Sequence, residues 1–200
     1  MALNRTTPFA ASLFGLLVGC ASQAPLPSNA SISPGANGGS YLDRVDFSYQ
    51  TPSARDFSQL KMCVAENISN NDVSLSDATG SFVGAYTGNY YQNSNVQTVA
   101  GKAVFKYVDE QLATLIANGT TISISQQLVP IKDIVKYEVK AGVSGSSVTL
   151  VFYNITRAQQ NTGYAANDGF NPVGVWSGAR SQDVYASLDA VANKVKACME

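Results

Sequence analysis

Histidine is absent from this chain of 200 residues, and its absence excludes several kinds of active site. Histidine is the usual general base and the commonest metal ligand in proteins. A Ser-His-Asp or Cys-His nucleophile therefore cannot be assembled within the chain. The three cysteines are too few for a four-cysteine zinc site. We expect no cofactor and no metal, and the composition favours a binding role over an enzymatic one.

Charged residues are also scarce. They make up 14% of the chain, the formal net charge is −1, and no run of Lys or Arg occurs. Such a chain lacks the basic patch that attracts phosphate backbones, so we expect no nucleic-acid partner. Hydrophobic residues account for 45%, which is sufficient for one folded core.

An apolar run near the N-terminus stops at a cysteine. Residues 9–19, FAASLFGLLVG, follow a short segment that carries Arg5. The run is too short for a membrane-spanning helix, but it is typical of a signal peptide. It ends in Leu17-Val18-Gly19-Cys20, which resembles the lipobox of bacterial lipoproteins. The resemblance implies cleavage before Cys20 and acylation of that cysteine. The alternatives are an ordinary secretory signal or an uncleaved hydrophobic anchor.

The segment after Cys20 has the composition of a linker. Residues 21–40 contain three Pro, three Gly and five Ser, with no charged and no aromatic residue. Such a segment buries too little apolar surface to fold. We therefore expect a signal peptide over 1–19, a lipidated flexible tether over 20–40 and one folded domain over 41–200.

The resemblance to lipoproteins also implies a location. Acyl chains on Cys20 would attach the protein to a membrane of the bacterial envelope. Ala21 follows the cysteine. By analogy with enterobacterial sorting, the lack of Asp at this position implies the outer membrane. The folded domain would then lie in the periplasm or at the cell surface.

Two segments in the second half of the chain predict a β-hairpin. Residues 135–143, VKYEVKAGV, alternate between apolar and polar side chains, as in a half-buried antiparallel strand. A glycine- and serine-rich turn follows, and residues 148–156 predict the returning strand.

Three other segments are β-rich but less regular. Residues 60–68 and 96–108 are expected to be extended, with Gly101 as a possible bulge. Residues 113–125 contain two β-rich runs around an Asn-Gly pair, which is typical of a hairpin turn. The alternative is a helix over 102–117, with Gly119 as its C-cap.

An amphipathic helix is predicted at the C-terminus, after a Gly- and Asn-rich connection over 157–180. Ser181 is the expected N-cap of this helix. The apolar residues are spaced by 4, 3, 4 and 3 positions and form one stripe: Val184, Leu188, Val191, Val195 and Cys198. The chain is therefore expected to be an α+β protein, with a mostly antiparallel sheet packed against this helix in two layers.

Two cysteines remain if Cys20 carries lipid. Cys63 lies in the β-rich segment 60–68, and Cys198 lies on the apolar stripe of the C-terminal helix. An exported protein matures in an oxidising compartment, where an even number of cysteines usually pairs. We expect a Cys63–Cys198 disulfide. Two buried free thiols are the alternative.

Aromatic residues supply the candidate binding sites. Tyr86, Tyr90 and Tyr91 lie in the uncharged stretch GSFVGAYTGNYYQN over residues 80–93. Tyr164 and the single tryptophan, Trp176, lie in the long connection, together with Asn167, Asp168 and Phe170. Such side chains can stack on a sugar or a peptide, and binding residues are often found in loops. The alternative is that these aromatic rings serve only packing.

The leading functional hypothesis is a membrane-anchored, non-catalytic binding or accessory module. Its partner would be an envelope protein or the cell wall. A hydrolase that cleaves envelope glycans with two carboxylates is one alternative. However, the four glutamates show no spacing that marks a catalytic pair: Glu66, Glu110, Glu138 and Glu200. A surface-exposed lipoprotein that contacts a host or the environment is the other alternative.

Overall fold

The computed structural model describes residues 25–35, 38–126 and 129–200. Its main element is a seven-stranded antiparallel sheet with the order β1-β2-β10-β9-β8-β7, in which β11 also pairs with β10. The strands are β1 (Ala30–Pro34), β2 (Ser40–Gln50), β7 (Phe105–Asp109), β8 (Thr114–Ser125), β9 (Ile131–Ser144), β10 (Ser147–Gln159) and β11 (Asn171–Pro172). The expected signal peptide and Cys20 lie outside the described residues.

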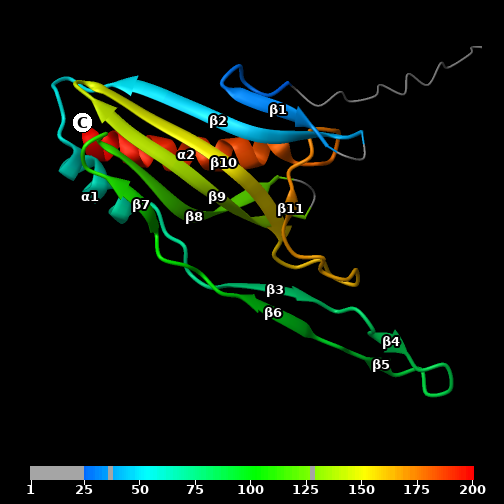
Figure 1. Cartoon of the computed structure of the whole chain (residues 1–200). Coiled ribbons are helices and arrows are strands. Elements are labelled where there is room, and N and C mark those ends of the chain that lie inside the picture. Colours follow the sequence, from blue (N-terminus) through cyan, green and yellow to red (C-terminus); the bar gives the residue numbers. More distant parts are fainter. Residues whose placement is uncertain (1–24, 36–37, 127–128) are drawn as a thin grey trace, which may run out of the picture.

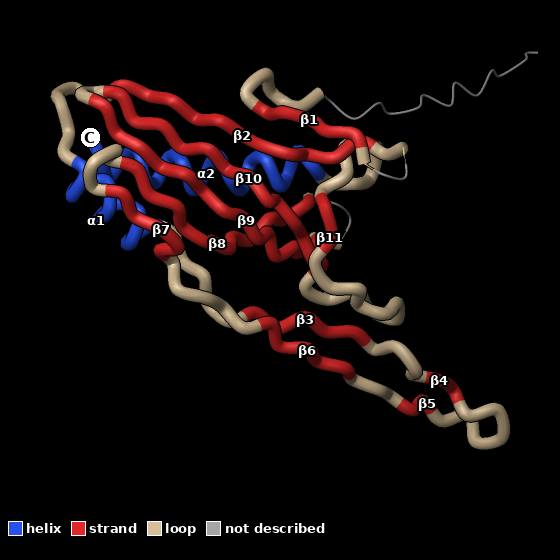
Figure 2. The backbone as a smooth tube through the Cα atoms, in the orientation of Figure 1, coloured by secondary structure: helices blue, strands red, loops and turns tan. Residues whose placement is uncertain are grey.

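Two helices, α1 (Phe57–Asn67) and α2 (Ser181–Met199), cover one face of this sheet. Figure 2 shows both helices behind the strands. The predicted stripe of α2 faces the core: its four aliphatic side chains are buried, and Cys198 is half-buried. The predicted α+β architecture is therefore confirmed. Within the described residues, no helix is long and apolar enough to cross a membrane.

The central hairpin is also confirmed. β9 and β10 pair in antiparallel register, with Val148 opposite Val143 and Phe152 opposite Val139. The alternation in β9 has the expected sense, because its odd-numbered residues from Val135 to Ala141 are buried against the helices. The ring of Phe152 meets the ring of Tyr137 edge to face, with centroids 5.1 Å apart.

The prediction of a strand over residues 60–68 is wrong, because residues 60–67 lie in α1 and Ile68 is the C-cap of this helix. The Asp56 carboxylate accepts a hydrogen bond from the backbone N–H of Gln59 at 2.7 Å and caps the helix. Phe57, Leu60 and Val64 then repeat with helical spacing and are buried. An Asp followed three residues later by Gln is the signal of a helix start. That signal lies before the segment that the prediction considered.

The prediction of a hairpin around Asn118-Gly119 is also wrong. β8 pairs with β9 without interruption, and Gly119 lies opposite Tyr137. A Cβ atom at Gly119 would overlap the ring of Tyr137. Glycine is therefore needed here for close packing between strands, and it forms no turn. The alternative helix over 102–117 is absent as well, because β7 and β8 occupy most of that segment.

The extended segment 96–108 is interrupted. It contributes to β6 (Asn95–Val99) and to β7, and residues 100–104 between them have no regular structure. Gly101 does not form a strand bulge. It lies against the backbone of Asn70, where a Cβ atom would have no room. Its N–H donates to the Asp72 carboxylate at 2.8 Å.

Two further boundaries differ from prediction. β1 pairs with β2 as an edge strand, so residues 30–34 belong to the folded domain and the expectation of a flexible tether is wrong for them. Helix α2 has Arg180 as its N-cap, in the left-handed conformation with φ 61°, and Ser181 is the first helical residue. The composition of residues 30–34 resembles that of a linker, because β1 is short and only partly buried and therefore contains few apolar residues.

Cys63 and Cys198 form the predicted disulfide, with their Cα atoms 5.6 Å apart. Cys63 is fully buried in α1, and Cys198 lies in the last turn of α2. The disulfide therefore links the two helices of the covering layer directly.

A two-stranded ribbon projects from the sheet. It consists of β3 (Val73–Asp77) and β6, followed further out by β4 (Phe82–Val83) and β5 (Tyr90–Tyr91). We call residues 73–99 the arm. Figure 1 shows the arm leaving the sheet beyond β7 and extending well past the body of the domain. A two-stranded ribbon of this kind has little core of its own, so its stability depends on contacts at its base.

Candidate binding surface

The outer part of the arm carries no charge and exposes apolar side chains. No charged residue occurs between Asp77 and Lys102. Phe82 and Val83 are 58% and 63% exposed, and Tyr86, in the loop between β4 and β5, is fully exposed. Tyr90 and Tyr91 are about half-exposed, at 50% and 45%. Three of the predicted binding residues therefore lie together at the tip of the arm.

Pairing between β4 and β5 orders these rings. Phe82 lies opposite Tyr91, and Val83 lies opposite Tyr90. The rings of Phe82 and Tyr91 are stacked, with centroids 5.0 Å apart and planes inclined by 16°. The sequence reasoning did not single out Phe82 or Val83, although both lie in the stretch that it considered. Strand pairing could have indicated them, because residues opposite a candidate share its surface.

Tyr164, from the loop after β10, extends this aromatic surface. The Tyr90 hydroxyl donates a hydrogen bond to the Tyr164 hydroxyl at 3.3 Å. The backbone N–H of Ala78 donates to the carbonyl of Gly163 at 2.6 Å, so the loop and the arm are also joined next to the tyrosine pair. The tip and the loop are therefore connected on the face of the ribbon that carries Tyr90, while Phe82 and Tyr91 lie on the opposite face. We call the exposed side chains of both faces together the aromatic tip: Phe82, Val83, Tyr86, Tyr90, Tyr91 and Tyr164.

The Asp77 carboxylate holds the middle of the arm. It accepts hydrogen bonds from the Asn95 side chain at 2.7 Å, from the N–H of Thr79 at 2.9 Å and from the N–H of Asn167 at 3.1 Å. These hydrogen bonds, led by that of Asn95, lower the pKa of Asp77 to about 2. Asn167, which the sequence suggested as a binding residue, therefore has a structural role here.

The base of the arm packs on the face of the sheet away from the helices. Leu75, Ile134 and Ala158 form a small buried cluster there, next to Phe170. The N–H of Ser76 donates to the carbonyl of Gln160 at 2.9 Å. This cluster is separate from the main core, and it fixes the direction in which the arm leaves the domain.

Trp176 lies in a different place from the aromatic tip. Its ring meets Tyr41 edge to face, with centroids 5.4 Å apart, and covers Gly174 so closely that a Cβ atom there would overlap it. Tyr41 and Gly174 also form an isolated β-bridge. Trp176 is therefore engaged in holding the connection before α2 against β2, and the structure does not bring it together with the candidate tyrosines.

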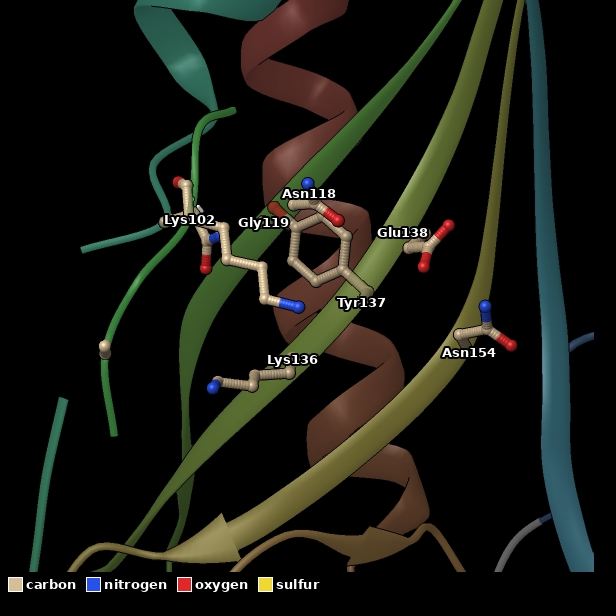
Figure 3. Close-up of a pocket in the computed structure, with 9 residues that line it drawn as sticks. Lys102, Asn118, Gly119, Lys136, Tyr137, Glu138 and Asn154 are labelled. Atoms are coloured by element: carbon tan, nitrogen blue, oxygen red, sulfur yellow. Dashed lines mark hydrogen bonds between the residues drawn. The ribbon is translucent and has the colours of Figure 1, made fainter. Parts of the chain in front are cut away.

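A small polar cavity lies on the sheet next to residues 100–104. It has a volume of about 170 Å³, and Lys102, Lys136, Glu138 and Asn154 are among the residues that line it (Figure 3). Burial, together with the nearby charge of Lys102, lowers the pKa of Lys136. Glu138 is held at 2.8 Å by the ammonium group of Lys106, which lowers the pKa of Glu138. The cavity therefore offers the ammonium groups of Lys102 and Lys136 and a single carboxylate, Glu138, which is already paired with Lys106. It does not contain the two carboxylates that glycan hydrolysis requires.

The other cavities give no better support to a glycan hydrolase, which requires two carboxylates facing each other. Each of five cavities in the described part of the chain is lined by a single acidic residue: Glu138, Asp43, Asp72, Asp46 and Asp168, respectively. Among the same described residues, no group of three His, Cys, Asp or Glu side chains could hold a metal ion.

Comparisons of the chain with protein-family models, with characterised proteins and with solved structures find no match. The candidate surface therefore rests on its own geometry and chemistry.

Proposed function

We propose that this protein is a lipid-anchored lipoprotein of the bacterial outer membrane, whose folded domain is a non-catalytic binding module. The arm is its contact element, and the aromatic tip binds a protein of the cell envelope. The observation that carries this proposal is the exposure of five apolar and aromatic side chains at the end of a projecting ribbon, where no charged residue occurs between Asp77 and Lys102.

The composition of the tip supports a protein as the partner. Tyr, Ser, Gly and Asn predominate between residues 80 and 95. Loops that recognise proteins are rich in these same residues, because tyrosine offers a large contact area with few rotatable bonds and the small polar residues adapt their hydrogen bonds. A lipid surface would favour basic residues beside the aromatic ones, and the tip has none.

The position of the tip also supports this proposal. Apolar side chains that are exposed as a group reduce the solubility of a protein unless a partner covers them. The hydrogen bonds at Asp77 and the cluster around Leu75 hold the arm in one direction before any partner binds. A pre-ordered surface loses less conformational entropy on association.

Photo-crosslinking in intact cells tests the arm. A photoreactive amino acid replaces Tyr86 in one variant and Leu112 in another. Leu112 is 73% exposed on the turn between β7 and β8, close to the Lys61–Glu110 ion pair and away from the arm. We expect a discrete protein adduct from position 86 and none from position 112. Adding Phe82→Ser to the position-86 variant should remove the adduct, because Phe82 is an exposed aromatic ring of the same tip.

Three outcomes would contradict the proposal. Equal adducts from both positions would indicate random collision. An adduct to lipid, or to a second copy of the chain, would replace the envelope protein as the partner of the tip. An adduct that persists with Phe82→Ser would show that the aromatic side chains are not the contact.

The anchor is tested separately by intact mass. Protein purified from the membrane fraction should have lost residues 1–19 and gained the mass of acyl chains on Cys20. Replacement of Cys20 by Ser should abolish this gain. A cleaved protein without acyl chains would refute the lipoprotein assignment but leave the test of the arm unaffected.

A further inference from the structure

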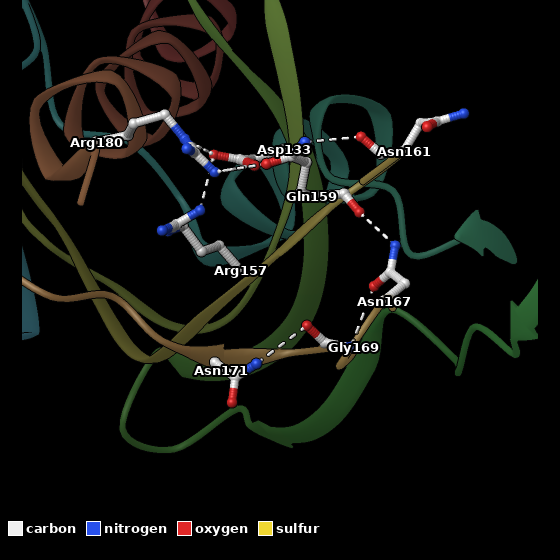
Figure 4. Close-up of polar contacts among 8 residues, drawn as sticks. All are labelled: Asp133, Arg157, Gln159, Asn161, Asn167, Gly169, Asn171 and Arg180. Carbon is white, nitrogen blue, oxygen red and sulfur yellow. Dashed lines mark hydrogen bonds and ion pairs between the residues drawn. The ribbon is translucent and has the colours of Figure 1, made fainter. Parts of the chain in front are cut away.

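Two arginines and one aspartate meet at the start of α2. The Asp133 side chain is 1% exposed, and those of Arg180 and Arg157 are 13% and 20% exposed. Arg180 binds both carboxylate oxygens of Asp133, at 2.8 Å and 3.0 Å, and Arg157 binds one of them at 3.1 Å (Figure 4). Two guanidinium groups thus share one carboxylate, so this largely buried cluster carries an excess of one positive charge.

Arg157 keeps unused hydrogen-bonding capacity. Its Nε is buried and has no hydrogen-bond partner among the described residues. Burial is the main cause that lowers the pKa of this guanidinium, and the charge of Arg180 acts in the same direction. A buried donor without a partner and a repulsion between two cations are both unfavourable. An anion beside the guanidinium groups would offset the repulsion between them.

A cavity of about 220 Å³ opens beside these guanidinium groups. Its lining includes both arginines, and also Thr162 from the loop that follows β10 and Asn171 from β11. Asp168 lies on its rim and is exposed, and within the described chain no ion pair joins it to either arginine. The inner wall of the cavity is therefore positive, and the remaining negative charge is at the entrance.

We propose that this cavity is a binding site for one oxyanion group, either a carboxylate or a phosphate, held by Arg157 with Arg180. A guanidinium presents parallel N–H groups that match two oxygens of such a group. The carboxylate of Asp133 fixes Arg180 in place, and Gln159 accepts a further hydrogen bond from Arg180 at 3.2 Å. This site is independent of the aromatic tip and of the function proposed for it.

Arginine Nε–H signals in NMR spectra report on this site directly. The full-length mature protein is titrated with sodium phosphate and, separately, with sodium acetate, against sodium chloride at equal ionic strength. We expect a saturable shift of the Arg157 signal with at least one of the two anions. Arg44, which is exposed and paired with Asp46, is the internal control and should not show a saturable shift. Saturation with phosphate alone or with acetate alone identifies the group that is bound.

Two variants test the assignment. Arg157→Gln should weaken binding, followed at the Arg180 signal, by about tenfold or more, because a charge-assisted hydrogen bond is lost. Asp168→Asn should strengthen binding a few-fold, because a repulsive charge at the entrance is removed. Thermal unfolding verifies that each variant is folded, since Arg180 and Asp133 remain paired in both. Shifts that do not saturate with either anion, or that are equal at Arg44, would overturn the proposal. Unchanged affinity in a folded Arg157→Gln variant would also overturn it.

Discussion

Cys63 in α1 and Cys198 in α2 are joined by a disulfide across 135 positions of the sequence. Closing so long a loop restricts the unfolded chain strongly. In the chain-entropy description, such a bond stabilises the folded state by about 4–5 kcal/mol. We expect the paired variant Cys63→Ala/Cys198→Ala to lose a stability of this order in urea denaturation. Adding a reductant should destabilise the original protein and leave the variant unchanged. Equal stability of the original protein with and without reductant would contradict this prediction.

Gly119 is expected to tolerate no larger residue. Gly119→Ala places a methyl group against the ring of Tyr137, which is itself packed on Phe152. Forcing an extra methyl group into a packed core costs about 1–3 kcal/mol. Gly142→Ala in β9 is the matched control, because there the nearest atom, Thr114 Oγ1, would be 3.4 Å from the new Cβ. Urea denaturation should show a clearly larger loss for the variant at position 119, and similar losses would disprove the packing argument.

Asp77 makes the order of the arm dependent on pH. The folded state lowers its pKa to about 2, below the value in an unfolded chain. Its contribution to stability is therefore complete above pH ~4, and it is lost as the pH falls towards 2. The amide signals of Thr79 and Asn167 should titrate with this low pKa and should not titrate in Asp77→Asn. A titration midpoint near the ordinary value would show that the three hydrogen bonds do not hold the carboxylate.

Leu188 is expected to be essential for the packing of α2 on the sheet. Its side chain is fully buried in the main core. Leu188→Ala should lower the free energy of unfolding by about 2–5 kcal/mol, because the truncation leaves a cavity. Lys194→Ala on the exposed side of the same helix should change it by less than about 0.5 kcal/mol. Comparable changes in the two variants would contradict the orientation of the helix.

Several predictions from the sequence were right because they depended on local periodicity. The alternation over residues 135–143 and the apolar stripe that begins at Val184 each specify which face is buried, whatever the rest of the chain does. The pairing of Cys63 with Cys198 followed from the number of cysteines and the expected compartment.

Other predictions were wrong because the deciding contact comes from elsewhere in the chain. Asn118-Gly119 has the sequence of a hairpin turn, but the ring of Tyr137 on β9 requires a glycine within a continuous strand. Residues 30–34 have the composition of a linker, and they are ordered because the edge of β2 offers backbone hydrogen bonds. In α1, the cap at Asp56 would have corrected the prediction from the sequence itself.

By itself, the sequence determined the class of fold, the central hairpin, the C-terminal helix and the choice of aromatic candidates. Only the tertiary structure decided that Tyr164 joins Tyr90 while Trp176 lies apart, and that Arg157 and Arg180 share Asp133. The physical reason is that periodicity along the chain reports only which side of an element is buried. The neighbours across strands and loops are set by the packing of the whole domain.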